Sequence, residues 1–187
     1  MPIETLRVAA FVSYLSSWLV LVITAVVGAL PQFRGHGVTA FQARLPVIAG
    51  TFLQSIAALG IALTLDDGPL RTSTFELAAA LLLAPLSAAI FAWAQRSMPK
   101  YSEQETLLTS GPYQWVRHPI YLAFFAMLLA TGLLASSGPK LIVAAVLYLA
   151  GCEIRIAIEE ADLNHQFPAS YSNYTKHTPW RYLPGIR

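Results

Sequence analysis

The sequence predicts an all-α integral membrane protein with about five transmembrane helices. Hydrophobic residues make up 56% of the 187 residues and charged residues only 12%, whereas a soluble domain carries about 25% charged residues. The charges are also segregated, which leaves long stretches without any charge. Most of the surface must therefore face something other than water, and the length allows a single membrane domain, residues 1–187.

The first three predicted helices lie in the N-terminal half. A helix of about 20 apolar residues crosses the hydrocarbon core of a bilayer, and the predicted spans here are residues 8–30, 45–65 and 76–95. The first exceeds the ~7–15 apolar residues of a signal peptide, so we expect a span and not a cleaved leader. The second is uncharged, with Gln54 as its most polar residue. The third follows Thr74 and Glu76, which predict an N-terminal cap with an acid in the first turn.

The last two predicted spans are residues 119–136 and 140–158, separated by Gly138 and Pro139. The final helix is uncharged only as far as Cys152, and its helical pattern then continues through Glu153 and beyond into the aqueous phase. One cysteine cannot form an internal disulfide, so Cys152 is expected to be a small buried hydrophobic residue.

Basic residues are unequally divided between the two sides of this topology. One side carries three, Arg7, Arg71 and Lys140, and the other carries nine, Arg34, Arg44, Arg96, Lys100, Arg117, Arg155, Lys176, Arg181 and Arg187. The positive-inside rule then predicts an outer N-terminus and a cytoplasmic C-terminus. Residues 96–118 and 159–187 would share the cytoplasmic face, where a cytoplasmic cofactor is accessible.

The segment GPYQWVRHPIY, residues 111–121, is the densest unusual stretch. An interfacial turn with an aromatic belt and a snorkelling Arg117 explains part of it. It does not explain His118 directly before Pro119, a residue favoured at the first position of a helix. The free N–H groups of a helix start attract anions, so Arg117, His118 and this helix end predict a carboxylate-binding site.

A second cluster lies at the end of the last helix, where Arg155 and Glu159 are four residues apart and share one helix face. Charges at the end of a transmembrane helix are costly unless they are paired or face a polar cavity. We favour a site facing the bundle interior over an ordinary surface-charged extension. The aromatic tail after Phe167 would lie either at the headgroups or over the cavity as a lid.

Other kinds of site are not indicated. The net charge of +2, with scattered basic residues, does not suggest a nucleic-acid partner. His36, His165 and His177 have no ligand spacing, and neither a metal motif nor a phosphate-binding loop is present. We expect no metal and no nucleic acid.

The two clusters resemble a known family. LLTSGPYQWVRHPIY is similar to the signature LVTSGPYxxVRHPxY of isoprenylcysteine carboxyl methyltransferases and, more loosely, of phospholipid methyltransferases. RIAIEEADLNHQFPASYSNYTKHTPWRYLP resembles the later pattern of an Arg, an EE pair and a Tyr- and Pro-rich tail, so that the resemblance covers residues 93–184. The chain departs from this pattern at Ala123 and Pro168, where the family usually has Gly.

The resemblance implies S-adenosyl-L-methionine as cofactor, bound in a cytoplasmic pocket formed by the C-terminal half. Its implied binding residues are Glu105, Thr106, Leu107 and Leu108 through the backbone, and Tyr113, His118, Pro119, Ile120, Tyr121 and Glu159 at its polar end. The implied catalytic residues are Arg155 facing the acceptor carboxylate, Arg117 as a second candidate for that role, and Glu160 as base or cation binder if the acceptor is an amine.

The expected activity is methylation of the carboxylate of a prenylcysteine-like or other lipophilic acceptor that enters from the bilayer. Two alternatives stay open: a phospholipid-type N-methyltransferase, and an NADPH-dependent membrane reductase of the sterol type, which has a similar RHPxY-like segment. A non-catalytic membrane scaffold is a third interpretation. The small Ala-rich chain suggests a bacterial inner membrane protein.

Overall fold

The computed structural model describes residues 2–33, 45–63, 72–98, 106–135, 138–183 and 185. All regular structure within these ranges is helical, which confirms the all-α prediction. The helices are α1 (Ile3–Phe33), α2 (Leu45–Ala62), α4 (Thr74–Ser97), the 3-10 turn η2 (Gly111–Gln114), α5 (Pro119–Leu134), α6 (Gly138–Gln166) and α7 (Pro168–His177).

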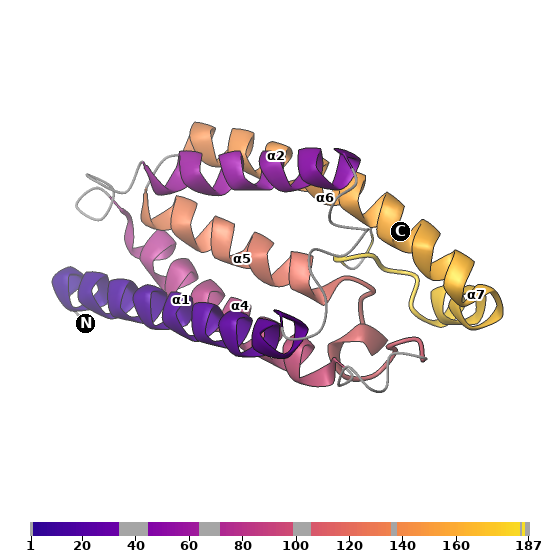
Figure 1. Cartoon of the computed structure of the whole chain (residues 1–187). Helices are drawn as coiled ribbons and strands as arrows, with labels where there is room; N and C mark the ends of the chain where they lie inside the picture. The colour runs from indigo at the N-terminus through magenta and orange to yellow at the C-terminus, as the bar shows by residue number, and fades with distance from the viewer. Residues whose placement is uncertain are drawn as a thin grey trace.

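The long helices form a bundle around α5 (Figure 1). On one side of α5 lie α1 and α4, and on the other lie α2 and α6, which pack along each other. Successive helices run in alternating directions, so the start of α5, the end of α4 and the C-terminal part of α6 meet at one end of the bundle. That end carries the predicted polar segments.

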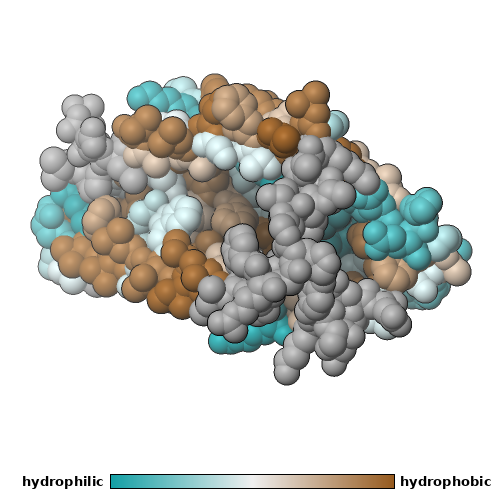
Figure 2. Space-filling model, viewed as in Figure 1, coloured by the Kyte–Doolittle hydropathy of each residue, from teal (hydrophilic) through white to brown (hydrophobic). Residues whose placement is uncertain are grey.

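Four helices of the described chain are long and apolar enough to cross a membrane: residues 3–26 of α1, then α2, α4 and α6. The central helix α5 is a shorter apolar helix of 16 residues, which at 1.5 Å per residue is about 24 Å long. Ten of its residues are buried, because its neighbours shield it on both sides. Many large apolar side chains of α1, α2 and α4 are exposed instead, including Leu19, Phe52 and Leu82, as a lipid-facing surface requires (Figure 2).

Helix ends follow the local sequence with small corrections. The cap of α4 is Ser73 and not Thr74: its hydroxyl accepts from the Glu76 N–H at 3.3 Å, and its own N–H donates to the Glu76 carboxylate at 2.8 Å. Pro119 is the first residue of α5 with His118 at the N-cap, as predicted. The tail contains a further helix, α7, which the sequence does not predict; Pro168 begins it.

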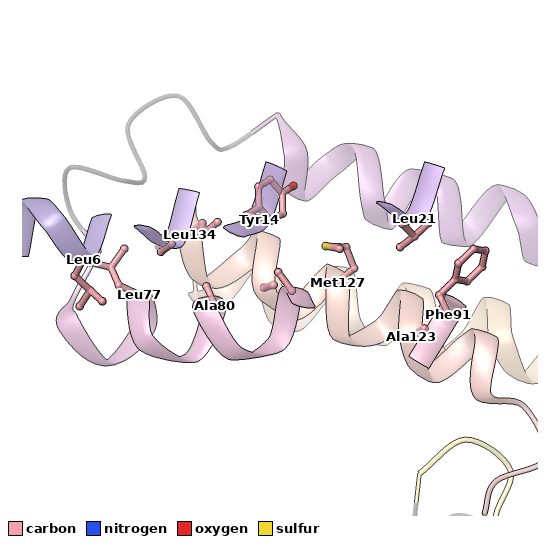
Figure 3. Close-up of a cluster of buried hydrophobic side chains, with 12 residues drawn as sticks. Leu6, Tyr14, Leu21, Leu77, Ala80, Phe91, Ala123, Met127 and Leu134 are labelled. Atoms are coloured by element: carbon pink, nitrogen blue, oxygen red, sulfur yellow. The ribbon is translucent and has the colours of Figure 1, made fainter. Parts of the chain in front are cut away.

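Large and small apolar side chains, among the latter Ala80 and Ala123, pack together in the core (Figure 3). Side chains of α1, α4 and α5, among them Tyr14, Phe91 and Met127, form one buried cluster. Ala123 is fully buried, and its carbonyl accepts a 2.7 Å hydrogen bond from Ser87. Helices in lipid associate through such small-residue contacts and interhelical hydrogen bonds.

The backbones of α2 and α6 approach each other closely at Gly50 and Gly151. A Cβ atom placed on Gly151 would lie 2.5 Å from the Gly50 carbonyl oxygen, and one placed on Gly50 would lie 2.8 Å from the Gly151 oxygen. Only glycine fits at such a backbone contact. This contact places α2 directly beside the charged end of α6.

Candidate functional site

The predicted Arg-His-Pro segment is joined to the C-terminal tail through the backbone. The Arg117 N–H donates to the Trp180 carbonyl at 2.9 Å, and the His118 N–H donates to the Arg181 carbonyl at 2.7 Å. These bonds hold the tail across the start of α5. The tail is therefore part of the folded polar end of the bundle.

Arg117 strengthens this connection with its side chain. Its Nε donates to Glu160 at 2.8 Å, and its terminal nitrogen donates to the carbonyls of Thr178 and Pro179 at 3.0 and 2.7 Å. Only 8% of the Arg117 side chain and 16% of the Glu160 side chain are exposed. Both groups are engaged in holding the tail, and neither lines the cavity described next.

A cavity of about 440 Å³ opens at this end of the bundle. Its wall is formed by residues of α1, α2, α5, α6 and η2 and by the helix caps Met98 and His118. These residues are Trp18, Thr51, Gln54, Ser55, Ala58, Met98, Tyr113, His118, Pro119, Ile120, Tyr121, Phe124, Tyr148, Arg155 and Glu159. The two sequence clusters, 38 residues apart between Tyr121 and Glu159, thus meet in one site.

Arg155 and Glu159 supply opposite charges on one wall of this cavity. The Tyr121 hydroxyl donates to Glu159 at 3.2 Å, and the Arg155 guanidinium lies 5.4 Å from the centre of the Tyr121 ring. Among the described residues, the buried Nε of Arg155 has no hydrogen-bond partner. The site therefore presents a carboxylate beside a guanidinium with an unused donor.

His118 is buried between the two acidic side chains that follow each other on α6. Its Nδ1 lies 3.7 Å from Glu159 and its Nε2 3.2 Å from Glu160, and only 3% of its side chain is exposed. The ring is oriented by Glu160 and borders the cavity together with Tyr121. His118 thus connects the tail-holding ion pair to the cavity wall.

Tyr113 borders the cavity from η2. Burial raises the pKa of its phenol, and the negative charge of Glu159 raises it further. Its carbonyl accepts from the Tyr174 hydroxyl of α7 at 2.6 Å. Tyr113 is therefore a neutral hydroxyl group, held in place by the tail.

The remaining predicted cofactor residues lie elsewhere. Thr106 and Leu107 line a second cavity of about 630 Å³, together with Gln114, Phe167, Ser170, Asn173, Tyr174, His177 and others. Leu108 is half-buried beside them, and Glu105 lies outside the described residues. The structure thus distributes the predicted cofactor residues over two neighbouring cavities, with Tyr174 and the backbone of Tyr113 between them.

Sequence reasoning did not identify the contribution of α2. Thr51, Gln54, Ser55 and Ala58 follow the spacing of one helix face and line the first cavity. Gln54 stood out as the most polar residue of its segment, and this signal could have led to the whole face. Within the described chain, no group of three or more His, Cys, Asp or Glu residues is placed to hold a metal.

The fold and the site define a polytopic all-α membrane protein with a charged cavity at one end of its bundle. Residues 72–165, half of the chain, match the model of the isoprenylcysteine carboxyl methyltransferase (ICMT) family, and the chain belongs to this family. The match begins at Thr72, so it includes neither α1 nor α2.

Two relatives are named protein-S-isoprenylcysteine O-methyltransferase. The protein from Schizosaccharomyces pombe is 34% identical over 80 residues, which cover 43% of this chain and 34% of that protein. The protein from Xenopus laevis is 35% identical over 78 residues, which cover 42% of this chain and 27% of that protein. The matched part thus spans about a third or less of the length of these relatives.

Proposed function

We propose that the protein is an S-adenosyl-L-methionine-dependent methyltransferase that methylates the carboxylate of a lipophilic acceptor, prenylcysteine-like in chemistry. The observation that carries this proposal is the presence of a guanidinium, Arg155, and a carboxylate, Glu159, on the wall of one cavity within a membrane bundle. Family membership and the names of the two relatives support it.

The donors and acceptors at this end of the bundle fit the cofactor. Its ammonium group needs an acceptor, which Glu159 offers at the cavity wall. Its carboxylate needs donors. The backbone N–H groups of Ile120 and Tyr121 lie in the first turn of α5, where no helical carbonyl is available to them, and His118 makes no side-chain cap. When bound, the cofactor supplies a methyl group on a sulfonium, which is reactive toward a nucleophilic oxygen.

The chain itself contributes position and a dry environment. A carboxylic acid is ionised near neutral pH, so its oxygen attacks without a general base. Arg155 orients such a carboxylate through its planar guanidinium. Catalysis then comes from holding the carboxylate in line with the methyl group and from excluding water.

An apolar extension of the cavity supports a lipophilic acceptor. A smaller cavity of about 70 Å³ shares Trp18, Ala58, Phe124 and Tyr148 with the first cavity and continues into the bundle core. It is lined further by Tyr14, Ile61, Ala62, Met127, Leu128 and Thr131. An acceptor with its carboxylate at Arg155 would place an apolar chain here.

We assign Arg117 and Glu160 as positioning residues that keep the tail and His118 in place, because their polar groups are used in those contacts. We also propose that the N-terminus is outside and the C-terminus cytoplasmic, in a bacterial inner membrane. This orientation lets the cofactor enter from the cytoplasm and the acceptor from the bilayer.

The direct test combines purified protein in detergent, labelled S-adenosyl-L-methionine, and a panel of prenylcysteine analogues and phospholipids. We expect label on the prenylcysteine carboxylate, in a form released by alkali as a methyl ester would be. Alkali-stable label on a phospholipid amine would replace carboxyl methylation with N-methylation. Label on neither class would refute the acceptor assignment.

Ligand binding distinguishes S-adenosyl-L-methionine from NADPH as the cofactor. S-adenosylhomocysteine should raise the thermal unfolding midpoint and NADPH should not; the reverse result would support a membrane reductase. Arg155→Ala should abolish carboxyl methylation and keep the S-adenosylhomocysteine effect, whereas His118→Ala should lose that effect. If both variants behave like the wild type in both assays, the site assignment is wrong.

A further inference from the structure

The face of α2 that lines the cavity is polar within an otherwise apolar helix. Thr51, Gln54 and Ser55 lie there beside Ala58, although α2 carries no charge and meets the criteria for a membrane span. Polar side chains in such a helix are expensive unless they have a partner or a function. Two of these three side chains contact the same group of α6.

That group is the guanidinium of Arg155. One of its terminal nitrogens donates to the Thr51 hydroxyl at 3.0 Å and to the Gln54 side-chain carbonyl at 3.3 Å. Each partner is itself oriented: Thr51 donates to the Val47 carbonyl at 2.8 Å, and the Gln54 amide donates to the Cys152 sulfur at 3.2 Å. Two oriented oxygens thus fix one corner of the guanidinium.

The backbone contact between the helices makes this arrangement possible. A Cβ atom on Gly50 would lie 2.7 Å from Cγ of Arg155, so the aliphatic part of Arg155 crosses α2 directly over Gly50. The Tyr121 ring adjoins the guanidinium at 5.4 Å. The orientation of Arg155 is therefore set by α2 and Tyr121, while its buried Nε has no partner among the described residues.

We propose that Thr51 and Gln54 are positioning residues that orient Arg155 for the acceptor carboxylate, so that α2, which lies outside the family match, sets the selectivity for a carboxylate acceptor. This inference rests on the proposed function. An arginine side chain is flexible, and its planar donor set recognises a carboxylate only in a defined orientation. Neutral oxygens suit this task, because they orient the cation without neutralising it.

The test uses side chains of matched shape. Gln54→Met and Thr51→Val remove the acceptor oxygens at nearly constant volume, and Thr51→Ser restores the hydroxyl. Ser17→Ala is the control, since Ser17 is a buried serine of α1 that donates to the Ser13 carbonyl and does not line the cavity. The measurements are KM and kcat for a prenylcysteine acceptor, and the thermal shift caused by S-adenosylhomocysteine.

We expect Gln54→Met and Thr51→Val to raise the acceptor KM about 10-fold, the scale of one hydrogen bond to a charged group. The S-adenosylhomocysteine shift should be unchanged, and Thr51→Ser and Ser17→Ala should resemble the wild type. A rise below about twofold in both variants, or an equal rise in Ser17→Ala, would overturn the inference.

A binding experiment tests the role of α2 independently of the proposed methyl transfer. It compares how strongly a prenylcysteine and its carboxamide stabilise the protein. In the wild type, the carboxylate should stabilise the protein more than the amide, and Gln54→Met should lose this difference. If the wild type shows the difference but transfers no methyl group, the proposed function fails and the role of α2 stands. If the wild type binds both equally, the role of α2 is refuted.

Discussion

Replacing Arg117 by Met should loosen the C-terminal tail at the start of α5, where the backbone bonds to Trp180 and Arg181 would still hold it. Methionine has a similar length but no donor, so the change removes the 2.8 Å bond to Glu160 and the bonds to the Thr178 and Pro179 carbonyls. Removing one partner of a buried ion pair costs about 3–5 kcal/mol. Glu160 keeps His118 at 3.2 Å and Arg181 at 3.5 Å, which places the expected loss near the lower end, about 3 kcal/mol.

The assay is unfolding by SDS in mild detergent micelles, combined with limited proteolysis of residues 178–183. Arg117→Lys, which keeps the charge but not the planar donor set, should lose less stability. Lys176→Gln, a change of an exposed cation on α7, should stay within about 0.5 kcal/mol.

A loss below about 1 kcal/mol for Arg117→Met, with the tail still protected from protease, would refute this reasoning. If the acceptor KM rose instead, without loss of stability, Arg117 would act on the acceptor, as the sequence suggested for a second candidate. Stability and KM therefore distinguish a residue that holds the tail from one that binds substrate.

Three other outcomes are expected. Gly151→Leu should separate α2 from α6 and cost about 1–3 kcal/mol in the same unfolding assay, whereas Gly60→Ala, whose Cβ would meet open space, should be neutral; equal effects would contradict the close packing. Ala58 borders both the first cavity and its smaller apolar extension. Ala58→Phe should reduce turnover of long-chain acceptors more than of short-chain acceptors and leave S-adenosylhomocysteine binding intact. An equal reduction of turnover for long and short acceptors would argue against an apolar chain in the extension. Burial raises the pKa of the Tyr113 and Tyr174 phenols above their ordinary value of 10.0, so ionisation above that pH favours the unfolded chain. Their contribution to stability should therefore be complete below pH 10 and decline above it. Replacing both residues by Phe should flatten this alkaline decline, and an unchanged profile of stability against pH would count against this reasoning.

The membrane class and most helices could be predicted because they depend on local properties. Long uncharged stretches satisfy the length and apolarity needed to cross lipid, and Pro119 starts a helix wherever it follows an extended residue. The tail helix was missed because Pro168 occurs in a polar, aromatic segment without an apolar period. Its stability depends on contacts of Tyr171 and Tyr174 that no short window of sequence contains.

The sequence also indicated which charged residues matter, but not how they divide the work. For binding the acceptor carboxylate, the resemblance made Arg155 the first candidate and Arg117 the second, and each is an arginine near a predicted helix end. The structure separates them: carbonyls of the tail and Glu160 engage Arg117, while Arg155 lies on the cavity wall with one donor unused. Partner choice depends on three-dimensional distance, which the order of residues does not encode directly.

By itself, the sequence determined an all-α membrane protein and the two motifs that place it in its family, because composition, helix starts and motif letters are local. Only the tertiary structure decided that Thr51 and Gln54 of α2 hold Arg155. That contact joins residues about a hundred positions apart and requires the glycine contact between α2 and α6. Side chains meet there because two backbones can approach closely, and this property belongs to the packed pair of helices.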